Sequence, residues 1–274
     1  MKSYVIFTDL DGTLLDHQTY DFAPAVPALC LIGERGIPLV ICSSKTRSEI
    51  ERYRERLENR HPFITENGGA IFIPKGYFSH FTPPTGFDLS NEGDYEVITL
   101  GASYGELRRA VQELRSEGFE ITGFGDMTAE GVAAVSGLTV EQAALAKERE
   151  FDEPFLFEGN EGDESALGEA IRAKGFNLTQ GRFFHILGES DKGKAVTIVS
   201  DLYRQIYGEI CTVALGDSLN DLPMLERADY PVLVKKPDGR HDTRIRVPHL
   251  RRADGIGPVG WNRALIELLR NDSA

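Results

Sequence analysis

One stretch near the N-terminus decides the fold: Tyr4-Val5-Ile6-Phe7-Thr8-Asp9-Leu10-Asp11-Gly12-Thr13. Its short apolar run is typical of a strand that is buried on both faces of a parallel sheet. Asp9 and Asp11 follow where this strand would end, which is the edge of an open α/β sheet at which ligands bind. Because alternate residues of a strand point to the same side, the two carboxylates can face one small volume.

Two carboxylates held so close together repel each other unless a cation or a shared proton lies between them. A hard divalent ion such as Mg²⁺, which prefers oxygen ligands, is the simplest solution. The alternative is an ordinary acidic turn after a strand, because Asp and Gly are common turn residues. Complementary motifs later in the chain favour the first interpretation.

The chain has 274 residues, a formal net charge of −13 and the composition of a globular protein. This length suits one large domain or two ordinary ones. The negative charge disfavours nucleic acids and anionic membranes as partners, and no stretch has the length and apolar character of a membrane span. Asp9 and Asp11 interrupt the first apolar run too early for a signal peptide. Cys30, Cys42 and Cys211 are odd in number and widely spaced, which indicates reduced thiols and predicts a cytoplasmic protein.

A strand–helix–strand unit follows the first strand. The apolar spacing predicts a helix over residues 24–33 and a second buried strand over residues 39–42, as in a parallel sheet. Ser43-Ser44-Lys45-Thr46 then leads into a charged helix over about residues 48–59. Hydroxyls, a lysine and free amides at a helix start suit an anion. Thr46 or Ser48 can also cap this helix, and the two roles are compatible.

The middle of the chain, from about residue 95 to residue 187, has a different pattern. Short alternating strands and amphipathic helices predict an antiparallel α+β layer. A parallel-sheet pattern resumes behind it. We therefore expect an α/β protein with a doubly wound, Rossmann-like core at residues 1–83 and 189–274 and an inserted unit at residues 84–188. Opening about residues 81–86 and 188–190 would gate turnover.

The last part of the chain carries two more polar strand or helix ends. A helix begins at Asp191-Lys192-Gly193-Lys194, and a buried strand over residues 210–215 ends in Gly216-Asp217-Ser218-Leu219-Asn220-Asp221. Together the strand ends offer carboxylates, a hydroxyl with a lysine, and a second lysine. This set suits phosphoryl transfer, in which a carboxylate attacks the phosphorus while a metal and cations offset the charge.

These motifs resemble those of the haloacid dehalogenase-type phosphatase superfamily. The resemblance implies that Asp9 is the nucleophile and that Asp11 protonates the leaving alkoxide and then activates water. It also implies that Ser43 binds a phosphate oxygen and that Lys192 neutralises the nucleophile and the phosphate. We prefer Lys192 to Lys194 because it matches the lysine–glycine step of the superfamily.

The same resemblance implies a Mg²⁺ site. Asp9, Asp217 and the main-chain carbonyl of Asp11 would bind the ion, while Asn220 and Asp221 would steady its waters or Lys192. The inserted unit resembles the large α/β cap of the sugar-phosphatase branch.

A narrower resemblance covers nearly the whole chain. Five segments are similar to the mannosyl-3-phosphoglycerate phosphatase family: Ser43-Ser44-Lys45-Thr46, Glu66-Asn67-Gly68-Gly69, Gly125-Asp126-Met127, Arg149-Glu150-Phe151-Asp152-Glu153-Pro154-Phe155 and Gly181-Arg182-Phe183-Phe184-His185. Members hydrolyse a 3-phosphoglycerate that carries a hexose on its 2-position and form mannosylglycerate, a compatible solute. The expected substrate-binding residues are Ser44, Lys45, Asn67, Arg149, Glu150 and Arg182.

Charge suggests how these residues divide the substrate. The guanidinium groups of Arg149 and Arg182 match a carboxylate or the phosphoglycerate end. Glu150, Glu153 and Asp126 are candidates for accepting sugar hydroxyls. The alternative for Arg149 and Glu150 is a solvated charge pair on a helix.

Several alternatives stay open from the sequence. His185 in an apolar hairpin is more often a hydrogen-bonded core histidine than a ligand. The enzyme could be another capped sugar phosphatase, acting on glucosyl-3-phosphoglycerate, sucrose phosphate or hexose phosphates, or a phosphohexomutase. A phosphosugar-binding regulator without catalysis is disfavoured, since a binder needs no nucleophile beside an acid. Either a monomer or a homodimer is expected.

Overall fold

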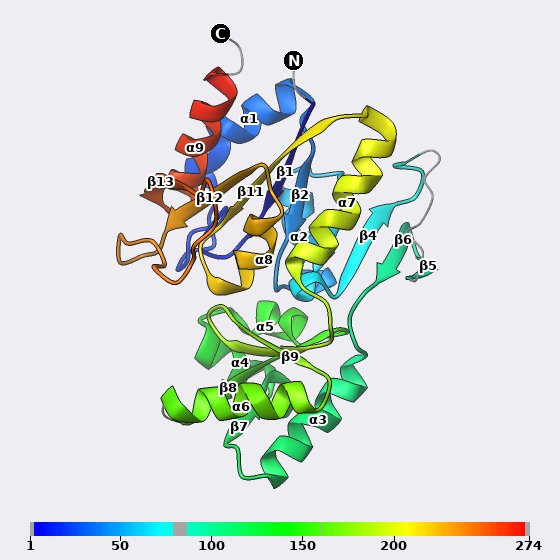
Figure 1. The fold of residues 1–274 in the computed structure, drawn as a ribbon, viewed down its shortest axis with the longest axis vertical. Coiled ribbons are helices and arrows are strands. Elements are labelled where there is room, and N and C mark those ends of the chain that lie inside the picture. The colour runs from blue at the N-terminus through cyan, green and yellow to red at the C-terminus, as the bar shows by residue number, and fades with distance from the viewer. Residues whose placement is uncertain (1–2, 79–86, 160, 272–274) are drawn as a thin grey trace.

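The computed structural model describes residues 3–78, 87–159 and 161–271. These residues form one large and one small sheet (Figure 1). The strand order of the large sheet is β13-β12-β11-β1-β2-β3-β4-β6-β5. Its strands are β1 (Ser3–Thr8), β2 (Leu39–Cys42), β3 (Phe63–Thr65), β4 (Ala70–Pro74), β5 (Asp88–Glu92), β6 (Tyr95–Thr99), β11 (Ile210–Gly216), β12 (Tyr230–Lys235) and β13 (Arg251–Ile256).

The strands from β13 to β3 are parallel, and β4, β6 and β5 continue the sheet in antiparallel fashion. β1 lies between β11 and β2, so the carboxyl ends of the three strands that carry the acidic and hydroxyl motifs meet at one edge. A turn at Asn67-Gly68 joins β3 to the antiparallel β4.

Helices cover both faces of this sheet. Residues of α1 (Val26–Glu34), α2 (Arg47–Arg56) and α9 (Gly257–Asn271) share one hydrophobic cluster with one face. Residues of α7 (Lys192–Tyr207) and α8 (Leu222–Glu226) share a second cluster with the other face. Tyr4 and Ile6 of β1 belong to the first cluster and Val5 and Phe7 to the second, which explains the continuous apolar run. The predicted doubly wound core is confirmed.

Local signals set the start of α2. Thr46 Oγ1 accepts a hydrogen bond from the amide of Glu49 at 3.2 Å, and the Glu49 carboxylate accepts one from the amide of Thr46 at 3.0 Å. This reciprocal pair satisfies two amides that have no partner inside the helix. Short 3₁₀ turns lie at η1 (Ala23–Ala25), η2 (Glu66–Gly68), η3 (Phe124–Asp126) and η4 (Leu219–Asp221).

The small sheet has the antiparallel order β7-β8-β10-β9. Its strands are β7 (Ile121–Gly123), β8 (Asp152–Phe157), β9 (Asn177–Gln180) and β10 (Phe184–Leu187). α3 (Tyr104–Ser116) and α6 (Glu161–Ala173) pack on one face. α4 (Ala129–Ser136) and α5 (Val140–Ala146) pack with Phe124 and Phe183, and α5 contacts α2 of the core. We call residues 102–187 the cap; it lies beyond the carboxyl ends of the parallel strands (Figure 1).

The start of this inserted unit differs from the expected boundary at residue 84. β5 and β6 pair with β4 and extend the core sheet, so the chain enters the cap only near Leu100. The alternating pattern of β6 reflects an antiparallel strand near an open sheet edge, which resembles a strand of a separate layer. The expected hinge at residues 81–86 lies outside the described residues. The chain leaves the cap again near Gly188. A Cβ on Gly188 would lie 2.4 Å from the amide nitrogen of Ala102, so the two segments that cross between core and cap lie in direct contact.

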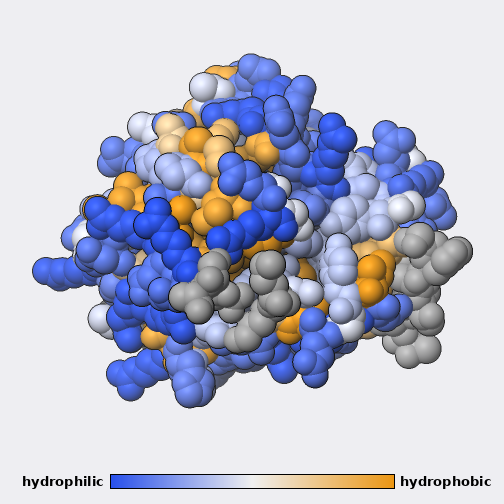
Figure 2. All heavy atoms as spheres, turned by 90° about the horizontal axis from the view of Figure 1, so that it is seen from above, coloured by the Kyte–Doolittle hydropathy of each residue, from blue (hydrophilic) through white to orange (hydrophobic). Residues whose placement is uncertain are grey.

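The end of the core that faces away from the cap is largely hydrophilic, with smaller hydrophobic groups between the charged residues (Figure 2). None of the helices in the described ranges has the length and hydropathy needed to cross a bilayer.

Candidate active site

Three buried carboxylates meet where β1 and β11 end. Oxygen atoms of Asp9, Asp217 and Asp221 all lie within 4.8 Å of one another. Gly12 allows this approach, because it has a φ of +78° and a Cβ there would lie 2.9 Å from Asp217 Oδ2. The acidic motifs at the two strand ends therefore form one cluster.

Lys192, at the start of α7, reaches into this cluster. Its Nζ lies 2.7 Å from Asp9 Oδ1 and 2.7 Å from Asp221 Oδ1, and the residue is 1% exposed. Lys194 is exposed, and its Nζ donates to the carbonyl oxygen of Glu189. One helix start thus directs one lysine to the carboxylates and the other to the surface.

A single lysine leaves this cluster with excess negative charge. Burial raises the pKa of Asp9 well above its usual value, Lys192 opposes this, and the nearby Asp221 and Asp217 reinforce it. Burial and repulsion from Asp221 raise the pKa of Asp217 to about 7. Burial would lower the pKa of Lys192, but Asp221 and Asp9 outweigh it and raise the pKa. An oxygen-lined, water-poor cluster with surplus negative charge fits a divalent cation.

Both oxygens of Asp221 are already engaged. Oδ1 binds Lys192, and Oδ2 accepts the amides of Asp217 at 2.9 Å and Ser218 at 3.1 Å. The hydroxyl of Ser218 donates to Asp217 Oδ1 at 2.9 Å. Asn220 donates from Nδ2 to Asn67 Oδ1 at 3.1 Å. Asp221 therefore shapes the loop that carries Asp217 and holds the lysine in place.

Asp11 lies beside Lys45. Its Oδ2 is 2.9 Å from Lys45 Nζ, while its Oδ1 is buried and has no hydrogen-bond partner among the described residues. Lys45 also approaches Glu49 at 3.3 Å and lies over the ring of Tyr20. Burial would lower the pKa of Lys45, but Asp11 and Glu49 raise it, so the lysine stays charged.

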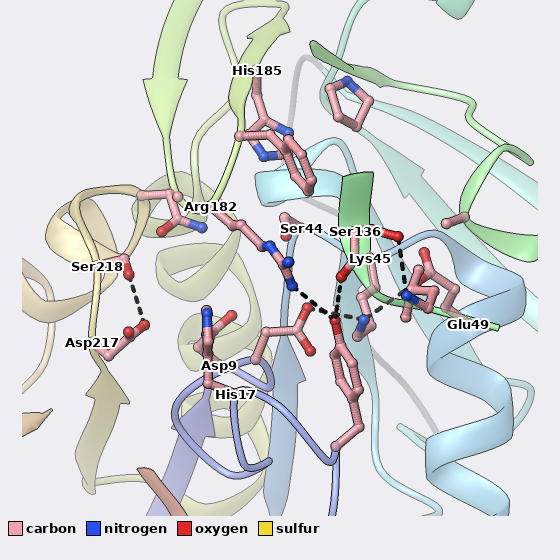
Figure 3. Close-up of a pocket in the computed structure, with 18 of the residues that line it drawn as sticks. Asp9, His17, Ser44, Lys45, Glu49, Ser136, Arg182, His185, Asp217 and Ser218 are labelled. Atoms are coloured by element: carbon pink, nitrogen blue, oxygen red, sulfur yellow. Dashed lines mark hydrogen bonds and ion pairs between the residues drawn. The ribbon is translucent and has the colours of Figure 1, made fainter. Parts of the chain in front are cut away.

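A pocket of about 390 Å³ opens from this cluster between the core and the cap (Figure 3). This volume lies within the range of small-molecule sites. Asp9 and Asp217 form its core side, and Arg182 and His185 lie across from them on cap segments (Figure 3). Of the expected substrate-binding residues, the pocket is lined by Ser44, Lys45, Arg149 and Arg182.

Arg149 and Arg182 differ in how many of their hydrogen-bond donors already have partners in the protein. α5 ends at Ala146, so Arg149 lies after the expected helix, and its side chain is only 5% exposed. Its Nη1 donates to the carbonyl oxygen of Ser44 at 2.7 Å. Arg182 is exposed, donates to the hydroxyl of Tyr20 at 3.4 Å, and has no carboxylate within 4.0 Å among the described residues. Arg182 is therefore available to an anionic ligand.

Other expected residues do not line the pocket. Ser43 is fully buried at the end of β2, and its hydroxyl accepts the amide of Lys45 at 3.3 Å. Asn67 is buried and donates to Asp152 at 2.7 Å. Glu150 is exposed outside the pocket, and its amide donates to the buried carboxylate of Glu66 at 3.1 Å.

Glu66 joins the core to the cap, because the amide of Phe151 also donates to it at 3.0 Å. Burial raises the pKa of Glu66 to about 8; Arg149 opposes this shift and Asp152 adds to it.

Asp126 and Glu153, which were expected to accept sugar hydroxyls, do not line the pocket. Glu153 lies 2.6 Å from Arg108 and accepts from the hydroxyl of Tyr104 at 2.8 Å. Asp126 pairs with Arg108 and Arg115. Both carboxylates belong to an ion-pair cluster around α3 of the cap, and their oxygens are occupied by these partners.

His185 was expected to be a hydrogen-bonded core histidine, and it is buried and bonded to Asp152 at 2.8 Å. It also lines the pocket together with Pro154, its partner across β10 and β8, which the sequence reasoning missed. Lys236 also lines the pocket, directly after β12. The rule that ligands lie at the carboxyl ends of parallel strands could have found Lys236.

Comparison with known proteins agrees with this geometry. Residues 6–80 match the haloacid dehalogenase-like hydrolase family. The chain is 52% identical over 268 residues to a glucosyl-3-phosphoglycerate/mannosyl-3-phosphoglycerate phosphatase of Methanococcoides burtonii, with 97% of each chain covered. It is 40% identical over 248 residues to a mannosyl-3-phosphoglycerate phosphatase of Pyrococcus furiosus, with 90% of this chain and 96% of the relative covered. The chain belongs to the mannosyl-3-phosphoglycerate phosphatase family.

This membership makes it a phosphoric monoester hydrolase of the haloacid dehalogenase type. Solved structures support the fold. A superfamily phosphatase of Bacteroides thetaiotaomicron superimposes with a TM-score of 0.67 at 17% identity, covering 100% of this chain and 96% of its own. A subclass IIB sugar phosphatase gives 0.64 at 16% identity, covering 98% and 99%.

Proposed function

We propose that this phosphatase hydrolyses mannosyl-3-phosphoglycerate to mannosylglycerate and phosphate, and that it accepts the glucosyl compound as well. The observation that carries the proposal is the position of Arg182, whose guanidinium lies across the pocket from the acidic cluster and is not paired with a carboxylate of the described residues. Such a substrate has a phosphate for one end of the pocket and a carboxylate for the other. The names of the relatives point to the same compounds.

In the proposed reaction, an oxygen of Asp9 attacks the phosphorus, and the bond between phosphorus and the 3-oxygen of the glycerate breaks. Asp11 gives its proton to that oxygen. A water then attacks the phosphorus of the aspartyl phosphate and transfers a proton to Asp11, which releases phosphate and restores Asp9. Lys192 holds Asp9 in position and offsets charge on the transferred group.

Asp9, Asp217 and the main-chain carbonyl of Asp11 are the groups that would hold Mg²⁺. When bound, the ion offsets the charge between the nucleophile and the phosphate oxygens. Asp221 serves this site indirectly, since it holds Lys192 and the amides of the Asp217 loop.

The other pocket cations take different roles. Arg182 binds the glycerate carboxylate, because within the described ranges its guanidinium donates only to the hydroxyl of Tyr20 and is not paired with a carboxylate. Arg149 of the cap donates to the carbonyl oxygen of Ser44 in the core, which holds the cap against the core. Lys45 is bound to Asp11 and Glu49 within the core, so it shapes the core wall of the pocket around the substrate. The three cysteines are free thiols, which supports a cytoplasmic location.

The test is phosphate release with Mg²⁺ from mannosyl- and glucosyl-3-phosphoglycerate, 3-phosphoglycerate, sucrose 6-phosphate and mannose 6-phosphate. We expect the two glycosylated glycerates to be strongly preferred. Similar rates for simple hexose phosphates would leave the chemistry standing and refute the substrate. A requirement for a bisphosphate activator with little free phosphate would identify a mutase.

A further inference from the structure

A chain of four buried polar side chains runs from the cap wall of the pocket into the core. His185 Nδ1 lies 2.8 Å from Asp152 Oδ1, Asn67 Nδ2 lies 2.7 Å from Asp152 Oδ2, and Asn220 Nδ2 lies 3.1 Å from Asn67 Oδ1. None of the four is more than 8% exposed. The chain starts on β10, crosses β8 and ends in the loop that carries Asp217.

The direction of these hydrogen bonds fixes the state of His185. An ionised Asp152 can only accept hydrogen bonds, so it accepts one from His185 Nδ1 and another from Asn67 Nδ2. A neutral His185 is thereby held as the tautomer with hydrogen on Nδ1. Its Nε2 then carries a lone pair and acts as an acceptor.

His185 belongs to the pocket wall (Figure 3). It lies on the face of the cap sheet that carries Pro154, its cross-strand partner. Phe124 and Phe183 line the same pocket. One acceptor among apolar rings suits a sugar ring, which has hydroxyl donors on its edge and CH groups on its faces. It does not suit a phosphate or a carboxylate, which would repel a lone pair.

We infer that His185 is a specificity-determining residue that accepts a hydrogen bond from a hydroxyl of the hexose through Nε2. This inference rests on the proposed function. Asp152 and Asn67 are positioning residues, because they act through the orientation and tautomer of His185. Since Asp152 belongs to the cap and Asn67 to the core, the chain is complete only with the cap seated on the core. The sugar contact is thereby linked to the loop that carries Asp217.

The kinetic test compares mannosyl-3-phosphoglycerate with 4-nitrophenyl phosphate, which has no sugar. In His185→Ala and in the isosteric Asp152→Asn, we expect kcat/KM for the sugar substrate to fall on the order of tenfold. We expect a clearly smaller fall for 4-nitrophenyl phosphate. His185→Gln serves as a second variant if His185→Ala unfolds. The control is His249→Asn, at an exposed site outside the pocket with a φ of 59° that Asn tolerates; it should stay within about twofold of wild type.

A second readout does not depend on turnover. In ¹⁵N NMR of the imidazole nitrogens, wild type should show His185 with hydrogen on Nδ1, and Asp152→Asn should show a mixture of tautomers. Mannosylglycerate should shift the Nε2 resonance, and glycerate should not.

The outcomes separate the two claims. Equal losses on both substrates, or an Nε2 resonance that mannosylglycerate does not move, would overturn the role of His185 and leave the proposed function intact. A wild type that releases phosphate from simple monoesters but not from either glycosylated glycerate would overturn both.

Discussion

Replacement of Lys192 by Met tests the charge arrangement of the site most directly. Methionine keeps much of the length of the side chain but removes both contacts of 2.7 Å, to Asp9 and to Asp221. Hydrogen bonds between charged groups contribute about 1.5–3 kcal/mol each. If most of this is lost in the transition state, the barrier rises by about 3–4 kcal/mol, and turnover falls roughly 100- to 1,000-fold.

The change also affects folding. Removal of one partner from a buried charged group costs about 3–5 kcal/mol, because Asp9 and Asp221 lose the ammonium group that pairs with both of them. For a chain of this size the melting temperature should fall by about 10 °C. Thermal unfolding must therefore be measured beside phosphate release, and the kinetics compared at a temperature at which the variant is folded.

The matched control is Lys194→Met, two residues further along α7. It makes the same change of charge, but this side chain is exposed, and its ammonium group donates to the carbonyl oxygen of Glu189 and not to a carboxylate of the described residues. We expect turnover within about twofold of wild type. A Lys192→Met enzyme with more than a tenth of wild-type turnover, or equal losses in both variants, would refute the reasoning.

Three further predictions concern single groups. Asp9→Asn should lower turnover at least about 1,000-fold with binding retained, and quenched mass spectrometry should detect no phosphorylated chain. Arg182→Ala should raise KM for glycerate-bearing substrates at least roughly tenfold, while the exposed Arg172→Ala should not. Glu66 binds its proton more tightly in the folded state, with a pKa of about 8, so wild-type stability should fall as pH rises from about 4.5 to 8. Between pH 5 and pH 9, the free energy of unfolding of Glu66→Gln, measured in denaturant, should therefore fall by about 4 kcal/mol less than that of the wild type. Parallel pH profiles of stability for the two proteins would contradict this.

The acidic part of the site could be predicted from the sequence because its position depends on short-range rules. Asp9 and Asp217 each follow a buried parallel strand, and parallel strands end at one edge of the sheet. No knowledge of the distant contacts between these strands was needed to bring the two carboxylates together.

The side-chain contacts of the cap could not be predicted from the sequence in this way. Asp152 and Glu153 are neighbours on β8, so they point to opposite faces of the cap sheet, Asp152 toward His185 and Glu153 toward Arg108. In a strand that is exposed on one face, alternating polar and apolar residues would show which side chains point to which face. β8 is buried from Asp152 to Phe155, with polar partners on both faces, so the alternation is absent.

The start of the cap was predicted at the wrong residue for a related reason. β5 and β6 are antiparallel strands at the open edge of the core sheet, and their pattern does not differ from that of strands in an independent antiparallel layer. Only the pairing of β6 with β4 assigns them to the core.

The contact between the two crossings near Ala102 and Gly188 makes the cap a replaceable module. The chain re-enters the core beside the point at which it left, so a short turn could close the core, and the length of the insert adds little to the entropy of that closure. A different cap could be grafted at this position without changing the register of β6 or the start of α7. Substrate range can therefore change by exchange of one segment while Asp9, Lys192 and Asp217 stay in place.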